Sequence, residues 1–177
     1  MPLPANQNAY SMTSIWAHWL TAILVVALFF THESERGSLG QIFHVSGGVL
    51  IALFFFWRII RRVRNGVAAK PSQPEALNWL SRIVLWGIIL SLLLVSVTGL
   101  LLPWTSGRAI DLFGLLIPSP ITGSRSLHGF FEEVHDFAGH AFIPLVGLHV
   151  LGVIKHAFMD RDKTIALRMS KPDPDGL

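Results

Sequence analysis

The feature that most constrains the fold is an uninterrupted stretch of twenty uncharged residues from Ile83 to Leu102. An α-helix rises about 1.5 Å per residue, so this stretch can cross a hydrocarbon core about 30 Å thick. Only 14% of the 177 residues are charged, against about 25% in an ordinary soluble domain. The sequence therefore predicts a membrane protein.

Four apolar stretches are long enough to span a bilayer, and they predict an all-α membrane protein built as a four-transmembrane-helix bundle. The expected spans are residues 12–31, 40–60, 77–102 and 137–158. The whole chain, 1–177, is expected to form one integral-membrane domain, with a disordered polar tail at 171–177. The apolar piece Ile110–Ile117 is too short to span, and we expect it to lie on the outer membrane surface as a lid.

The distribution of basic residues predicts the orientation of the bundle. Eleven lie around the second-to-third connection and the C-terminal segment, namely Arg58, Arg61, Arg62, Arg64, Lys70, Arg82, Lys155, Arg161, Lys163, Arg168 and Lys171. The other two connections hold three, namely Arg36, Arg108 and Arg125. Basic residues favour the cytoplasmic side, so both termini are expected in the cytoplasm. The cluster of arginines from Arg58 to Arg64 adjoins a membrane span. A position at the membrane surface therefore explains it better than a nucleic-acid-binding patch does.

The chain has no cysteine, which excludes disulfides, Fe–S clusters and thiolate zinc sites. It also excludes a haem attached covalently through a Cys-x-x-Cys-His motif. Any metal or haem must therefore be held non-covalently, and the eight histidines are the obvious ligands. Ionisable residues within membrane spans are costly and usually face the bundle interior, where they mark function.

Four histidines fall at two matched depths. His135 and His149 share one face of the fourth span, about 21 Å apart along its axis, whereas His140 points elsewhere. With both termini inside, topology pairs His18 with His149 near the inner side and His44 with His135 near the outer side. Each pair can supply two axial nitrogens to one iron. The pattern predicts two non-covalent b-type haems, although the small residues beside these histidines could also serve helix contacts.

Two arginines are candidate partners for haem propionates. Arg58 follows His44 by fourteen residues, so it faces the same way at the level of the inner haem. A guanidinium there could bind carboxylates in bidentate fashion, and the alternative is an arginine that snorkels to the interface. Arg82, at the inner start of the third span, is the second candidate.

Several short segments resemble the bacterial cytochrome b-561 family. They are His18-Trp19-Leu20, His44-Val45-Ser46-Gly47, Val134-His135, Gly147-Leu148-His149 and Phe113-Gly114-Leu115. The resemblance implies a four-helix di-haem protein of the bacterial inner membrane. Through the short, stand-alone members of the family, it also implies electron flow from superoxide to ubiquinone.

His156 is the candidate for a quinone site. It follows His149 by seven residues, on nearly the same face and about 10 Å closer to the cytoplasm. There it could give a quinone oxygen a hydrogen bond and a proton, with Lys155 and Ser14 assisting. The alternative is an interfacial histidine that contacts lipid headgroups.

Arg108, Arg125 and His128 are the candidates for a donor site on the outer face, although the outer segments carry more acidic than basic residues. This balance does not favour an anionic donor such as superoxide. One alternative function is an electron-transfer subunit that serves a separate dehydrogenase, hydrogenase or soluble redox protein. Another is a transporter whose histidines bind zinc or relay protons, but transport sites cluster near the midplane.

Overall fold

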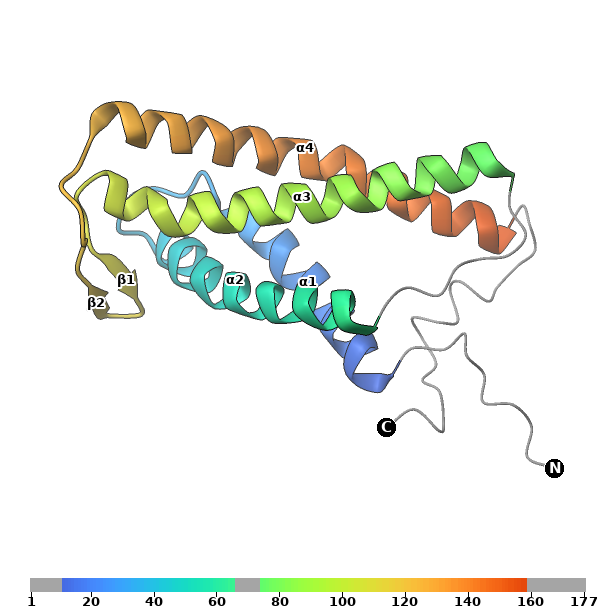
Figure 1. Cartoon of the computed structure of the whole chain (residues 1–177). Coiled ribbons are helices and arrows are strands. Elements are labelled where there is room, and N and C mark those ends of the chain that lie inside the picture. Colours follow the sequence, from blue (N-terminus) through green and yellow to red (C-terminus); the bar gives the residue numbers. More distant parts are fainter. Residues whose placement is uncertain (1–10, 66–73, 159–177) are drawn as a thin grey trace.

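The computed structural model describes residues 11–65 and 74–158 of the chain. The elements run α1 (Met12–Thr31), α2 (Leu39–Asn65), α3 (Glu75–Thr105), β1 (Ile110–Leu112), β2 (Leu115–Ile117) and α4 (Arg125–Phe158). Figure 1 shows four long helices and a small hairpin. Each helix is long and apolar enough to cross a membrane, so the predicted four-helix membrane fold is confirmed.

Serine residues mark the starts of three helices. Ser11, Ser38 and Ser124 precede α1, α2 and α4, and each hydroxyl accepts a hydrogen bond from the backbone N–H three residues later, at 3.4, 3.2 and 3.4 Å. These bonds satisfy N–H groups that a helix start leaves without a partner. Helix α3 instead begins directly after Pro74, whose fixed φ suits a helix start.

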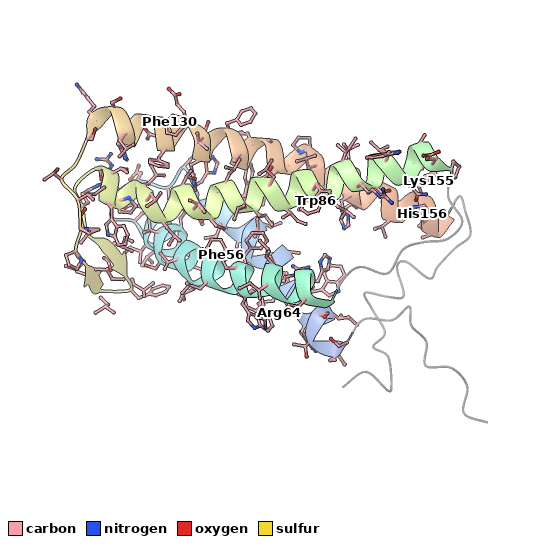
Figure 2. The ribbon with its side chains drawn as sticks, viewed as in Figure 1. Phe56, Arg64, Trp86, Phe130, Lys155 and His156 are labelled. Atoms are coloured by element: carbon pink, nitrogen blue, oxygen red, sulfur yellow. The ribbon has the colours of Figure 1, made fainter. Side chains whose placement is uncertain are left out.

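The helices pack as two pairs. Helices α3 and α4 lie side by side along most of their length, whereas α1 packs on α2, and α2 packs on α3 (Figure 1). The buried apolar core is small and includes Ala52, Phe55 and Ala138. Many large apolar side chains are exposed, such as Trp86 and Phe130 (Figure 2). This distribution is typical of helices whose outer faces contact lipid, because lipid removes the need to bury them.

The two ends of the bundle differ. One end, called here the hairpin end, carries β1, β2 and the α1–α2 connection. The other, called here the terminal end, carries the start of α1 and the end of α4 (Figure 1). At the terminal end the α1–α2 pair diverges from the α3–α4 pair. The bundle is therefore more closely assembled at the hairpin end.

The hairpin is fastened to α2 by one buried hydroxyl. Ser46 Oγ donates to the carbonyl of Asp111 at 2.8 Å and accepts the N–H of Phe113 at 3.1 Å. The turn between β1 and β2 places Phe113 at φ 51° and Gly114 at φ 94°, a left-handed conformation that a two-residue hairpin turn requires. Asp111 Oδ1 accepts the Gly114 N–H at 2.6 Å, which holds this turn.

The main departure from the predicted spans concerns α4, which begins at Arg125 and not near residue 137. Arg125–Asp136 contains several charged residues, so hydropathy does not detect it, although its backbone continues the helix. The apolar piece predicted as a lid is the β1–β2 hairpin. The predicted disordered tail at 171–177 lies outside the described residues.

Candidate functional site

Helix α4 brings two histidines against partners on two other helices. The ring centroids of His18 and His149 lie 6.4 Å apart, and those of His44 and His135 lie 6.2 Å apart. The ring planes are inclined by 63° and 78°. The structure therefore brings together the two pairs that topology predicts, one toward each end of the bundle.

The spacing within each pair suits two ligands on opposite sides of one iron. An imidazole nitrogen binds a metal at about 2.0 Å and lies about 1.15 Å from its ring centroid, so two axial rings have centroids about 6.3 Å apart. Within the described residues, no cluster of three or more His, Asp or Glu side chains could hold a metal ion. A pair of imidazoles alone fits a cofactor that brings its own equatorial ligands, as haem does.

The backbone beside the histidines leaves room for a flat ring. Gly48, Gly139 and Gly152 follow His44, His135 and His149 by three or four residues, the spacing of neighbours on one helix face. An added Cβ at any of these three glycines would meet no atom within 4 Å. The residues present therefore fit a haem in both the spacing of the donors and the space beside them.

At the hairpin end, neutral oxygen atoms orient both rings. His44 Nδ1 lies 2.9 Å from the carbonyl of Leu28, and His135 Nδ1 lies 3.1 Å from the carbonyl of Val95. When Nδ1 donates to these oxygens, Nε2 is left free to bind a metal.

Two further α3 residues shape the position of the His135 ring. Thr98 Oγ1 lies 3.1 Å from His135 Nδ1. A Cβ added at Gly99 would lie only 3.0 Å from His135 Cε1. The absence of a side chain at Gly99 therefore makes room for the ring.

At the terminal end, a charged side chain contacts the pair. Arg58 Nη2 lies 3.0 Å from His18 Nδ1, and Arg58 Nη1 donates to the carbonyl of Ala17 at 3.5 Å. Arginine can only donate, so His18 Nδ1 is the acceptor here, and a neutral ring then carries its proton on Nε2. His18 Nε2 would therefore bind iron only once Arg58 has turned away from Nδ1, as it would to reach a propionate. Within the part of the chain that the structure describes, no hydrogen bond reaches the His149 ring. Arg58 thus lies at the His18–His149 pair, at the depth that its spacing from His44 predicts.

The other residues predicted near the inner pair are spread apart. Arg82 is exposed, and its guanidinium lies 5.5 Å from the Trp79 ring. His156 is buried and Lys155 half-buried at the end of α4, next to the start of α3 (Figure 2). Ser14 lies at the start of α1, away from that end of α4 (Figure 1), and its hydroxyl lies 3.0 Å from that of Ser11. The structure therefore does not bring Ser14 to His156.

The residues predicted for the outer face all lie at the hairpin end but have separate partners. His128 Nδ1 lies 3.2 Å from Thr105 Oγ1, at the end of α3. Arg125 is the exposed first residue of α4. Arg108 is exposed and lines a pocket between α2 and the end of α3. His140, expected to point away from the pairs, lies against His32, with ring centroids 5.9 Å apart.

Sequence reasoning missed the atoms that orient the histidines. The carbonyls of Leu28 and Val95 carry no sequence signal, because every residue has a carbonyl. Thr98 and Gly99 did carry a sequence signal, because a residue with a hydroxyl group stands beside a glycine inside the most apolar span. Ser46, which fastens the hairpin, had only its polar character within a span as a signal.

Comparison with known proteins agrees with this geometry. The family model described as prokaryotic cytochrome b561 matches residues 9–170. "Cytochrome b561 homolog 2" of Escherichia coli (strain K12) is 23% identical over 99% of this chain and 98% of its own length. "Probable superoxide oxidase CybB" of Yersinia pestis is 25% identical, covering 92% of this chain and 96% of its own.

A third relative, "Cytochrome b561 homolog 1" of Escherichia coli (strain K12), is 23% identical over 92% of this chain and 97% of its own. The family is one of helical membrane proteins that bind b-type haem and transfer electrons. The family match covers nearly the whole of the four-helix bundle described above. The chain therefore belongs to the prokaryotic cytochrome b561 family.

Proposed function

We propose that the chain binds two non-covalent b-type haems, one between His18 and His149 and one between His44 and His135. The observation that carries this proposal is the ring spacing of 6.4 and 6.2 Å in the two pairs, close to the spacing of two axial imidazoles on one iron. Bound haem iron supplies a one-electron carrier. Two such carriers, at different depths in the bundle, give a path for electrons across a bilayer.

The protein orients the histidine ligands, leaves space beside them for the haem, and places a positive charge near one pair. The carbonyls of Leu28 and Val95 hold His44 and His135 with Nε2 available. Arg58 places a positive charge beside His18, where it can bind a propionate carboxylate. Arg82 is the weaker candidate for that role, because it is exposed and lies over Trp79.

We propose that the terminal end faces the cytoplasm of a bacterial cell, with the protein in the inner membrane. Four described basic residues support this orientation, since they lie in the terminal halves of their helices: Arg58, Arg64, Arg82 and Lys155. Basic residues at one end of a membrane bundle favour the cytoplasmic side.

We further propose that the protein oxidises superoxide at the hairpin end and reduces ubiquinone at the terminal end. Two superoxide anions each give up one electron and leave as O₂, and one ubiquinone takes both electrons and two protons to become ubiquinol. The name of the Yersinia pestis relative supports this substrate. Arg108, Arg125 and His128 lie at the hairpin end, and the two guanidinium charges would attract an anion locally, against the acidic excess of the outer segments.

His156 and Lys155 are the proposed quinone residues. Both lie in the last turn of α4, about 10 Å beyond His149 along the helix axis. A histidine at this position can donate a hydrogen bond to a quinone oxygen and pass a proton to it on reduction. Ser14 contributes less to this site, because it lies at the start of α1.

Haem content and rapid kinetics test the proposal. Purified protein should hold two acid-acetone-extractable haems per chain, counted as the pyridine haemochrome. In stopped-flow mixing, superoxide should reduce these haems and ubiquinone should then reoxidise them. Fewer than two haems would contradict the pairing. Two haems that superoxide does not reduce would contradict the donor and favour a subunit serving another redox protein.

The exit site is tested by His156→Phe, which keeps an aromatic ring but removes the proton donor. Both haem spectra and reduction by superoxide should be unchanged, whereas reoxidation by ubiquinone should slow by about 10²–10⁴-fold, the usual contribution of a positioned general acid. His140→Phe is the matched control, because His140 lies against His32 and not near the end of α4. Unchanged reoxidation in His156→Phe would place the exit site elsewhere.

A further inference from the structure

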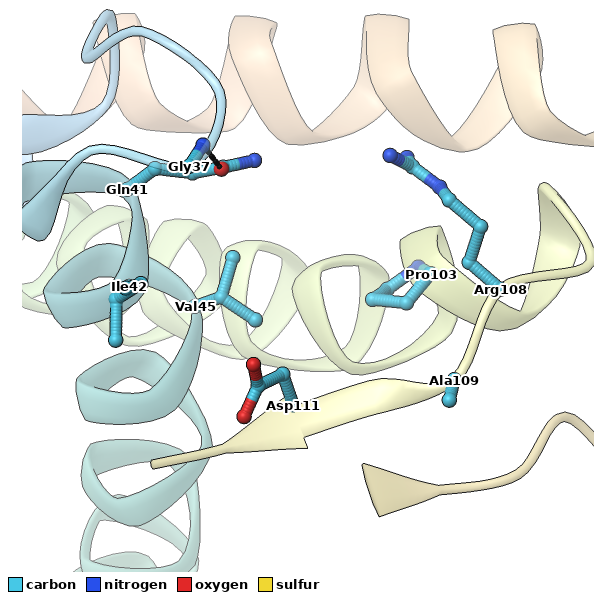
Figure 3. Close-up of a pocket in the computed structure, with 8 residues that line it drawn as sticks. All are labelled: Gly37, Gln41, Ile42, Val45, Pro103, Arg108, Ala109 and Asp111. Carbon is cyan, nitrogen blue, oxygen red and sulfur yellow. Dashed lines mark hydrogen bonds between the residues drawn. The ribbon is translucent and has the colours of Figure 1, made fainter. Parts of the chain in front are cut away.

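A pocket of about 240 Å³ opens at the hairpin end, between the first turns of α2, the end of α3 and β1. Its lining combines apolar residues, Val45 and Pro103 among them, with three polar ones, Gln41, Arg108 and Asp111. Figure 3 shows the guanidinium of Arg108 and the amide of Gln41 facing one another across the pocket, above Val45 and Pro103. The pocket therefore has an apolar wall and a polar rim.

The pocket lies on the hairpin side of the His44–His135 pair, as the sequence positions of its lining residues show. Gln41 precedes His44 by three residues, about one helical turn, and Val45 follows it directly. On α3, Pro103 lies five residues beyond Thr98, which contacts His135, and this is about 7.5 Å toward the hairpin end. A group that extends from the pair toward the hairpin end would therefore extend in the direction of this pocket.

The polar groups of the pocket are two donors, Arg108 and Gln41, and one carboxylate, Asp111. Arg108 Nε donates to Ser106 Oγ at 2.7 Å, and Arg108 forms no ion pair with any residue in 11–65 or 74–158. Gln41 Oε1 accepts the Gly37 N–H at 2.6 Å, so the NH₂ group is its remaining polar end. Asp111 Oδ1 accepts the Gly114 N–H at 2.6 Å, and this carboxylate lies across the pocket from the Arg108 guanidinium and the Gln41 amide (Figure 3).

We propose that Arg108 and Gln41 bind a propionate carboxylate of the haem held by His44 and His135, an inference that rests on the proposed function. A propionate extends from the edge of an apolar macrocycle, which matches a pocket whose walls are Val45 and Pro103 and whose rim donates hydrogen bonds. A guanidinium binds a carboxylate in a planar, two-point contact. Arg108 is then a haem-binding residue, and a free inorganic anion is the competing occupant.

Redox titration of the purified holoprotein tests this role. Arg108→Gln should retain both haems but lower the midpoint potential of the hairpin-end haem, because a positive charge near iron stabilises its reduced form. The expected change is about tenfold in the reduction equilibrium, or about 59 mV for one electron. The terminal-end haem should not change. Arg108→Lys should recover most of the shift, since it restores the charge.

Arg36→Gln is the matched control, because it removes, from the same end of the bundle, an exposed arginine whose own side chain does not line the pocket. It should leave both potentials unchanged. Haem dimethyl ester, which has no free carboxylates, replaces haem in a second set of samples. Together with Arg108→Gln it gives the equivalent of a double-mutant cycle, with one change in the protein and one in the cofactor. With the ester, the effect of Arg108→Gln on the potential should become much smaller.

Each outcome separates the two proposals. Loss of only the hairpin-end haem in Arg108→Gln, with recovery in Arg108→Lys, would support the same contact. An unchanged potential with slower reduction by superoxide would assign Arg108 to a free anion and overturn the propionate contact. Fewer than two haems in the unmodified protein would instead contradict the proposed function itself.

Discussion

The two histidine pairs have nearly the same spacing, but different groups hold them. At the hairpin end, backbone carbonyls contact Nδ1 of both rings. At the terminal end, the guanidinium of Arg58 contacts His18, and no hydrogen bond from a described residue reaches the His149 ring. Neutral acceptors make an imidazole a stronger ligand and favour oxidised iron, whereas a positive charge favours reduced iron.

This difference predicts a direction for electron transfer. The half-buried Arg58 is screened less than the exposed Arg108, so the terminal-end haem should have the higher midpoint potential. Electrons would then move downhill in energy from the hairpin end to the terminal end, toward the proposed quinone residues.

The largest expected effect is the loss of one haem at a time. His44→Ala should remove only the hairpin-end haem and His149→Ala only the terminal-end haem, because each variant takes one of two axial nitrogens from a single pair. Pyridine haemochrome counts and optical redox titration would show this. His140→Ala should retain both haems. If one ligand variant lost both, the two ends would not be independent sites.

The next effect concerns the fit around His135. Gly99→Ala places a methyl group 3.0 Å from His135 Cε1, and overpacking of this kind costs roughly 1–3 kcal/mol. Haem occupancy at the hairpin end should fall while the terminal end keeps its haem. Gly147→Ala is the control, because a Cβ there meets nothing within 4 Å. Equal losses at both ends would mean that the methyl group destabilises the whole bundle.

A smaller effect is expected from the charge at the terminal end. Arg58→Leu should lower the midpoint potential of the terminal-end haem. The free energy of reduction should change by roughly 1–2 kcal/mol, which is the interaction of the guanidinium and iron charges about 8–16 Å apart at an effective dielectric constant of about 20. The hairpin-end haem, about 20 Å away, should hardly respond. Arg58→Lys should keep most of the potential. Equal shifts at both haems would argue that Arg58 only sets the orientation in the membrane.

The smallest effect is expected from a single acceptor. Thr98→Val removes the hydroxyl 3.1 Å from His135 Nδ1 and leaves the Val95 carbonyl in place. The midpoint potential of the hairpin-end haem should rise slightly. The free energy of reduction should change by less than about 1 kcal/mol, because the Val95 carbonyl remains as a hydrogen-bond acceptor. A fall in potential would mean that Thr98 donates to the ring.

The sequence predicts the fold well because membrane spans depend on local composition. It also predicts which histidines meet, since depth and helix azimuth follow from residue numbers alone. It places Ser14 at the depth of His156, whereas Ser14 lies at the start of α1 and His156 at the end of α4, because equal depth does not mean the same side of a bundle. The start of α4 at Arg125 was missed because hydropathy detects the membrane part of a helix and not its polar extension.

The bond network at Ser46 has a consequence for biogenesis. Asp111 and Phe113 follow α3, whereas Ser46 belongs to α2, so these contacts can form only after three helices have been inserted. An unsatisfied backbone group is costly near lipid, which favours the fastened state of the hairpin once α3 is in place. The two bonds of Ser46 would thus form late in assembly and fix the hairpin only once α3 lies against α2.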